Sequence, residues 1–106
     1  MIDIADIEAA RERIAPWVRQ TPVVPLAQLK TPIPGGPRVT LKLECLQVTG
    51  SFKARGAMNR LLTTPKDRIA NGVVTASGGN HGLAVARAGH LARVPTTVFL
   101  PDNASP

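Results

Sequence analysis

The stretch that follows Gly72 reads Val73-Val74-Thr75-Ala76-Ser77-Gly78-Gly79-Asn80-His81-Gly82. Its first four residues are small, apolar or β-branched and end at a glycine-rich turn, which predicts a buried strand. The mostly apolar residues from Asn80 to Leu91 predict a helix, and Thr96 to Leu100 predicts a second strand. Strand, helix and strand in this order form a right-handed βαβ unit with parallel strands. The fold class is therefore α/β with an open parallel sheet, which is incomplete because two strands leave its edges unpaired.

The residues before this unit predict two longer helices and one strand. Residues 4–18 carry apolar side chains at spacings of three and four, with Asp3 able to cap the start and Pro16 ending or kinking the last turn. Val39 to Glu44 alternates apolar and polar residues, which predicts a half-buried strand. A second helix, opened by Ser51, is expected to bury one apolar face, made of Ala54, Ala57, Met58, Leu61 and Leu62.

The remaining segments are connectors, and the length of the chain sets an upper bound on its organisation. Residues 21–22 and 30–37 are rich in turn residues, 66–71 predicts a short helix ending at Gly72, and 101–106 reads as the exit from the last strand. A chain of 106 residues can form at most one complete small domain.

Composition argues against several classes of partner. The chain has 13 basic and 7 acidic residues, but the basic ones are scattered, and only three aromatic residues are present, so nucleic-acid binding is disfavoured. No apolar run approaches the length of a membrane span, and the N-terminus lacks the pattern of a signal peptide. The single Cys45 has no metal-ligand spacing around it. We expect a cytoplasmic protein with no metal, no nucleic acid and no membrane.

The first segment whose residues could take part in chemistry is Gly50-Ser51-Phe52-Lys53, at the start of the second helix. A lysine in the first turn of a helix lies beside the positive end of the helix dipole, and burial would further favour the neutral, nucleophilic amine. An isolated lysine on a helix is more often a solvated surface group. Phe52 offers a flat apolar surface, and Gly56 lets another group approach the helix, so the neighbours favour a functional lysine.

The second segment is the turn from Ser77 to Gly82, where a strand ends and a helix begins. Glycines expose backbone N–H groups there, and the helix N-terminus adds positive potential, which suits a carboxylate or a phosphate. The alternative is a plain βα turn capped by Asn80. The spacing matches neither a Walker loop nor a dinucleotide fingerprint. His81 by itself is more typical of a capping residue than of a catalyst or a metal ligand.

Taken together, the motifs resemble the threonine and serine dehydratases (ammonia-lyases), which belong to the tryptophan-synthase-β-like, or fold type II, pyridoxal-phosphate enzymes. The resemblance covers nearly the whole chain and includes Gln20-Thr21-Pro22, Leu41-Lys42-Leu43-Glu44, Gly50-Ser51-Phe52-Lys53, Arg55-Gly56-Ala57 and Gly79-Asn80-His81-Gly82. It implies that residues 1–106 are the N-terminal portion of such an enzyme. Residues 1–65 would then contain the cofactor lysine, and 66–106 would begin the smaller βαβ domain.

The resemblance also implies a role for each residue of the two motifs. Lys53 would bind the cofactor pyridoxal 5′-phosphate covalently and act as the catalytic base. Phe52 would pack on one face of the pyridine ring, and Asn80 would hydrogen-bond the 3′-oxygen of the cofactor. The substrate carboxylate would be surrounded by Ser77, Gly78, Gly79, Asn80 and His81. Relatives that racemise carry a serine at the position of Gly78 as an acid/base, so Gly78 counts against racemisation.

The activity implied is a β-elimination that converts L-threonine or L-serine into a 2-oxo acid and ammonia, in an enzyme that forms a homo-oligomer when full length. Threonine synthase, serine racemase and a non-catalytic remnant are the alternatives. The glycine-rich phosphate site of the family lies C-terminal to the equivalent of Pro106. We therefore expect that this chain is part of a longer protein or a remnant, and that it is inactive by itself.

Overall fold

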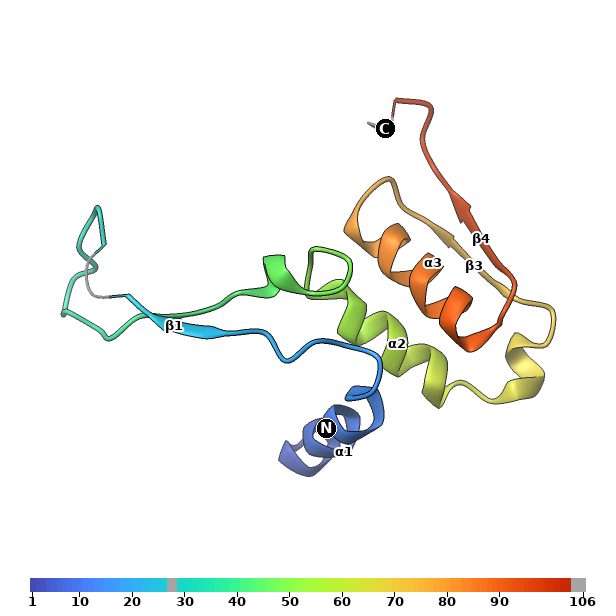
Figure 1. The fold of residues 1–106 in the computed structure, drawn as a ribbon, viewed down its shortest axis with the longest axis horizontal. Coiled ribbons are helices and arrows are strands. Elements are labelled where there is room, and N and C mark those ends of the chain that lie inside the picture. The colour runs from blue at the N-terminus through green and yellow to red at the C-terminus, as the bar shows by residue number, and fades with distance from the viewer. Residues whose placement is uncertain (27–28, 104–106) are drawn as a thin grey trace.

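A computed structural model describes residues 1–26 and 29–103. Two short sheets, three α-helices and two 3-10 turns make up the described chain (Figure 1). In chain order the elements are α1 Ile4–Ile14, β1 Val23–Pro25, β2 Thr40–Lys42, η1 Glu44–Leu46, α2 Lys53–Thr63, η2 Lys66–Ile69, β3 Val73–Ala76, α3 Asn80–Ala92 and β4 Thr96–Phe99.

The C-terminal elements form the predicted βαβ unit. Strands β3 and β4 are parallel, with Val73 opposite Thr96 and Ala76 opposite Phe99, and α3 connects them (Figure 1). The helix approaches the sheet closely at Gly89, where a Cβ atom would collide with the side chain of Thr96. The α/β fold class with a parallel pair of strands is confirmed, and α3 ends one residue beyond the predicted Leu91.

Only one face of this sheet is covered, so the prediction of a buried strand at residues 73–76 is wrong. Exposure alternates along both strands. On the uncovered face, the side chains of Val74 and Phe99 are 70% and 63% exposed. A strand is buried on both faces only when helices cover both, and among the described residues α3 covers one.

The core lies where α2 packs against α3. Ile14, Met58, Leu61 and Ala88 form a buried cluster, with Trp17, Val18, Ala57, Ile69, Val73, Leu91, Ala92 and Val94 packed around it. The predicted apolar face of the second helix is therefore largely confirmed, although Leu62 is 37% exposed. The prediction that Ser51 opens the helix is only partly right. The helix begins at Lys53 without a side-chain cap, and Ser51 Oγ accepts a long hydrogen bond from Lys53 N at 3.4 Å.

Helix α1 is capped as predicted but is buried less than its pattern indicates. The Asp3 side chain accepts from the Asp6 N–H, and Asp6 returns a bond to the Asp3 N–H, so the first turn is satisfied at both residues. Ile4 and Ile7 are 70% and 57% exposed, because the described chain packs against α1 only near its C-terminal end.

An arm of two antiparallel strands extends away from the helices (Figure 1). Strand β1 was not predicted, because Val23–Pro25 is too short to show an alternation. Strand β2 covers only three residues of the predicted 39–44, and Glu44 lies in η1 instead. The expected half-burial is also wrong, since Leu41 is 43% exposed. In the described part of the chain this arm projects away from the helices, so its apolar side chains stay exposed.

The last two connectors follow the prediction in part. The short helix expected at 66–71 is a 3-10 turn over Lys66–Ile69. Gly72 follows it with a φ of +98°, a conformation that favours glycine. Turn structure follows β4 at 102–103, and the rest of the predicted exit, 104–106, lies outside the described residues.

Candidate functional site

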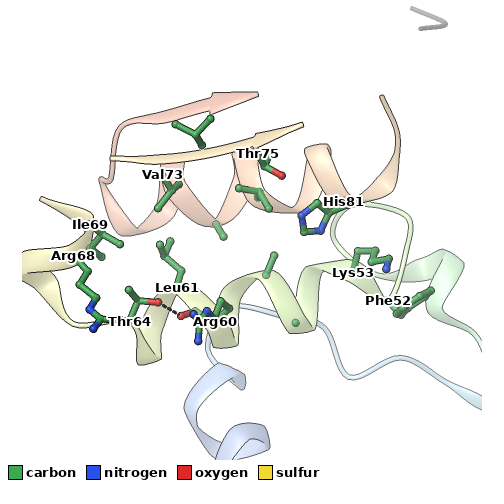
Figure 2. A pocket seen from close by; sticks show the side chains of 15 residues that line it. Phe52, Lys53, Arg60, Leu61, Thr64, Arg68, Ile69, Val73, Thr75 and His81 are labelled. Atoms are coloured by element: carbon green, nitrogen blue, oxygen red, sulfur yellow. Dashed lines mark hydrogen bonds between the residues drawn. The ribbon is translucent and has the colours of Figure 1, made fainter. Parts of the chain in front are cut away.

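A cleft of about 620 Å³ lies between α2 and the β3–α3 unit, alongside the surface where α2 packs against α3 (Figure 2). Helix α2 forms one wall, and β3 with the first turns of α3 forms the other. The lining residues are Phe52, Lys53, Gly56, Ala57, Arg60, Leu61, Thr64, Arg68, Ile69, Val73, Val74, Thr75, His81, Val85 and Ala88.

Lys53 and His81 lie at the same end of this cleft, one from each wall (Figure 2). Lys53 is the first residue of α2, and His81 is the second residue of α3. Both side chains are exposed. The Lys53 ammonium lies over the ring of Phe52, 5.0 Å from its centroid. The N-termini of two helices therefore face one space that solvent can enter.

The loop that precedes His81 leaves backbone donors free for a ligand. Helix α3 begins at Asn80 after the N-cap Gly79, and no side chain caps it. The first N–H groups of a helix have no partner within the helix, so those of Asn80 and His81 remain available. Because Asn80 is the first helical residue, it does not cap the helix, and the alternative of an Asn80-capped turn is wrong. The Ser77 hydroxyl accepts from the Gly79 N–H at 3.3 Å, which braces the loop.

The structure thus brings together some of the predicted site residues and leaves others at the rim. Phe52, Lys53 and His81 line the cleft. In the described part of the chain, the lining does not include Ser77, Gly78, Gly79 or Asn80, which form the end of β3, the loop and the start of α3.

Sequence reasoning did not assign Arg60, Thr64 and Thr75 to the site. Arg60 follows Lys53 by seven residues on α2, and Thr64, eleven residues after Lys53, is the C-cap of that helix, so the helical period counted from Lys53 would have identified them. Thr75 could have been found from the alternation along β3. Gly56 lies between Lys53 and Arg60 in α2. A Cβ atom at Gly56 would meet nothing within 4 Å, so the helix surface is open at this point.

The charges around the cleft favour an anionic ligand. Lys53 stands at one end and Arg60 and Arg68 at the other (Figure 2), and none of the described lining residues is acidic. A cleft lined by one sign of charge concentrates ligands of the opposite sign. Phosphate and carboxylate groups are therefore suited to this space.

A polar cluster holds the other side of the α2 N-terminus. The Arg55 guanidinium binds both carboxylate oxygens of Glu44, with Nη2 2.7 Å from Oε1 and Nε 2.9 Å from Oε2. The Thr21 hydroxyl donates to Glu44 Oε1 at 2.5 Å. The hydrogen bonds from Arg55, and secondarily that from Thr21, lower the pKa of Glu44 to about 2 against the opposing effect of burial. The bond to Glu44 in turn raises the pKa of Arg55.

Gln47 extends this cluster toward the N-terminal segment. Its Oε1 accepts from the backbone N–H of Arg19 at 2.8 Å and from that of Val48 at 2.9 Å. Its Nε2 donates to the Arg19 carbonyl at 2.9 Å. The buried polar residues among those described are Thr21, Gln47 and Ser51, and all three come before α2 in the sequence.

Two further observations concern the described residues as a whole. No group of three or more His, Cys, Asp or Glu side chains within 1–26 and 29–103 could hold a metal ion. None of the helices found there has the length and apolar character needed to cross a membrane.

The chain has clear relatives among characterised proteins. It is 42% identical over 104 residues to the phenylserine dehydratase of Ralstonia pickettii and 38% identical over 104 residues to the catabolic L-threonine dehydratase TdcB of Staphylococcus aureus. Each match covers 98% of this chain, but only 31% and 30% of the relative. Its structure superposes on maize serine racemase with a TM-score of 0.85 at 40% identity, covering 97% of this chain and 31% of the racemase.

The chain thus spans about 30% of the length of these relatives, which are named for different reactions. The superposition on maize serine racemase agrees with the α/β unit and with the helix that carries Lys53. The sequence profile of the family described as "Pyridoxal-phosphate dependent enzyme" matches residues 14–106. With both helix N-termini and the cleft between them inside that match, the chain belongs to the pyridoxal-phosphate-dependent enzymes of fold type II.

Proposed function

We propose that the protein carrying this chain converts L-threonine or L-serine into a 2-oxo acid and ammonia, with the water lost from the β-carbon regained when the product enamine is hydrolysed. The observation that carries this proposal is the cleft in which Lys53 and His81 lie together, from the N-termini of α2 and α3. A nucleophilic amine and an anion-binding helix start are the two features that such a substrate requires, because it has a reacting Cα and a fixed carboxylate.

The residues present fit the cofactor. The cleft is cationic, and Gly56 leaves open space on the α2 wall beside Lys53. Lys53 would hold pyridoxal phosphate covalently, Phe52 would pack on its ring, and Asn80 would bond its 3′-oxygen. When bound, the cofactor withdraws electrons from the substrate Cα. In the proposed reaction Lys53 Nζ would be the base that removes the Cα proton.

The loop from Ser77 to His81 would bind the substrate carboxylate. The free N–H groups at the start of α3 and the positive end of its dipole favour a negative charge there. Fixing the carboxylate on α3 while the amine reacts on the side of α2 would orient the Cα–H bond toward Lys53. The two walls of the cleft would then have separate tasks.

Racemisation is the second candidate, because maize serine racemase is 40% identical to this chain. Racemisation needs a proton donor on the face of Cα opposite the lysine. Residue 78 is a glycine and supplies no side chain, and the hydroxyl of the neighbouring Ser77 accepts from the Gly79 N–H within the loop. These features support elimination over racemisation.

We further propose that residues 1–65 and 66–106 belong to two domains of the intact protein, which forms a homo-oligomer in the cytoplasm. The exposed apolar side chains of Phe52, Val74 and Phe99 support additional packing surfaces beyond the described residues.

The lysine assignment is tested by Lys53→Ala in the intact protein, with Lys66→Ala as the matched control. Lys66 is an exposed lysine in η2 and does not line the cleft. We expect Lys53→Ala to abolish both the visible absorbance of the lysine-bound cofactor and 2-oxo acid formation, while Lys66→Ala retains both. Full turnover by the Lys53 variant would refute the assignment.

The reaction is tested by following 2-oxo acid and D-serine from L-serine in the same incubation. We expect 2-oxo acid as the main product of the wild-type protein. Gly78→Ser should raise the share of D-serine, because it adds a hydroxyl at the position where the resemblance implies that racemases carry their acid/base serine. D-serine as the main wild-type product would favour racemisation instead.

A further inference from the structure

The start of α2 is weakly held by its own residues. Its N-cap, Phe52, offers no side-chain cap, and Ser51 Oγ lies 3.4 Å from Lys53 N. The chain enters this turn through Gly50, whose φ is +71°. A helix start without a cap frays, so another contact must fix the first turn if the direction of Lys53 is to be defined.

The contacts of the Lys53 side chain do not fix its position either. Among the described residues its ammonium group contacts the Phe52 ring and makes no hydrogen bond. Phe52 is itself 60% exposed and so is not locked by packing. The position of Lys53 Nζ therefore depends on where the backbone of the first turn is held.

Arg55 makes contacts that can fix the first turn from the opposite side of the helix. It follows Lys53 by two residues, which places the two side chains about 200° apart around the helix axis. Lys53 lines the cleft, whereas Arg55 lines a different groove, together with residues of α1 and β2. A contact made by Arg55 can fix the first turn without occupying the ligand space.

The contacts of Arg55 reach four oxygen atoms on three residues, which lie in two segments of the chain. Besides the two carboxylate oxygens of Glu44, Nη2 lies 3.3 Å from Thr21 Oγ1 and 3.2 Å from the Arg19 carbonyl. Arg19 is bound in turn through its N–H and carbonyl to Gln47, which is 2% exposed, and Thr21 is 4% exposed. The ion pair is thus anchored in buried groups, where a bidentate geometry is rigid.

We propose that the Glu44–Arg55 ion pair, braced by Thr21 and Gln47, positions Lys53 by fixing the first turn of α2. This inference rests on the function proposed above, since it gives Lys53 a covalent task. Glu44 and Arg55 are positioning residues, because neither lines the cleft. Their loss moves the reacting amine and leaves its chemical identity unchanged.

The test compares Glu44→Gln with wild type in the intact protein, using Arg13→Gln as the matched control. Arg13 also bonds a residue of α2, Asn59, but on an exposed surface six residues beyond Lys53. Two quantities are measured well below the melting temperature: hydrogen exchange of the amides at 51–55, and the rate at which borohydride traps pyridoxal phosphate on Lys53. Lys66 in the same chain serves as the internal reference for the trapping rate.

We expect Glu44→Gln to speed amide exchange at 51–55 and to slow trapping on Lys53 roughly tenfold, with trapping on Lys66 unchanged. In turnover, kcat should fall more than KM rises. Arg13→Gln should match wild type in amide exchange, in trapping and in turnover. Arg55→Lys keeps the positive charge but cannot bind both carboxylate oxygens in the bidentate geometry, so it should show an intermediate effect. It is the variant to measure if Glu44→Gln does not fold.

The outcomes separate the two proposals. If the wild-type protein traps no more cofactor on Lys53 than on Lys66, the proposed function fails. If wild type is selective for Lys53 and both Glu44→Gln and Arg55→Lys keep wild-type exchange and trapping rates, the positioning role is wrong while the function stands. A lower melting temperature without slower trapping would reduce the ion pair to a structural role and also overturn the inference.

Discussion

Gly82, in the first turn of α3, lies directly against the backbone carbonyl of Ser77 at the other end of the loop. A Cβ atom at residue 82 would be 2.5 Å from that oxygen and 3.1 Å from Val98 Cγ1. Backbone atoms do not yield to such a contact without a shift of the loop or the helix. The loop proposed to bind the substrate carboxylate therefore has its shape because residue 82 lacks a side chain.

Gly82→Ala should lower the free energy of unfolding by about 1–3 kcal/mol, because the new methyl group overpacks the space between α3, the loop and β4. Displacement of Ser77 should also raise KM for the amino-acid substrate. Urea denaturation and steady-state kinetics of the intact protein measure the two effects.

Gly56→Ala is the matched control for that substitution. It lies in α2 with nothing within 4 Å of its Cβ position, so it should raise the free energy of unfolding by up to about 1 kcal/mol through helix propensity alone. If the two alanine variants changed stability in the same direction, the steric argument for Gly82 would be wrong.

Asn80→Ala should weaken cofactor binding and slow turnover while leaving the fold intact. Asn80 is exposed, and within the described chain its side chain makes no hydrogen bond, so its removal leaves no buried partner unsatisfied. Titration of the variant with pyridoxal phosphate and a thermal melt measure the two parts. Wild-type affinity and kinetics would mean that the loop is only a turn.

The Glu44–Arg55 pair predicts an acid-dependent loss of stability. The pKa of the Glu44 carboxyl is about 2 in the folded protein, below its ordinary value of 4.5. A carboxyl whose folded pKa is lowered stabilises the fold fully above its unfolded pKa, and this contribution is lost as the pH falls from 4.5 toward 2. The contribution of the Glu44 carboxylate to the free energy of unfolding is below ~3 kcal/mol, and solvent screening at the partly exposed Arg55 reduces it further.

Glu44→Gln isolates this contribution from that of the other carboxyl groups. The difference in free energy of unfolding between wild type and variant should be largest at neutral pH and should shrink between pH 4.5 and pH 2. Denaturant titrations at several pH values measure it. A difference that did not change with pH would show that the carboxylate charge contributes nothing.

Residues 1–106 by themselves should bind pyridoxal phosphate poorly and form no 2-oxo acid. Lys53 and His81 are exposed, and the described cleft offers a phosphate group the guanidinium groups of Arg60 and Arg68 but no loop of converging backbone donors. Cofactor titration and an assay with L-threonine and L-serine test this. Stoichiometric binding with turnover would contradict it and would require a phosphate site built between copies of the chain.

Local sequence determined the elements whose stabilising contacts are close along the chain. The Asp3 cap, the apolar period of α2 and the β-branched runs of β3 and β4 all depend on neighbours within a few residues, and the structure has each of them. The resemblance of the Lys53 and Asn80 motifs to a family of pyridoxal-phosphate enzymes likewise needed only the order of residues. The division into two domains at residue 65 stays a prediction.

Tertiary structure decided which faces are buried and which distant groups meet. The alternation at residues 39–44 predicted a strand but did not show which segment would pair with it or cover it. The strand became one side of an exposed arm because none of the described helices covers it. The contact of Arg55 with Glu44 and Thr21 joins residues 11 and 34 positions apart, which no local pattern reveals. Likewise Lys53 and His81 share a cleft only because α2 packs beside α3, since burial and long-range pairing depend on the packing of whole elements.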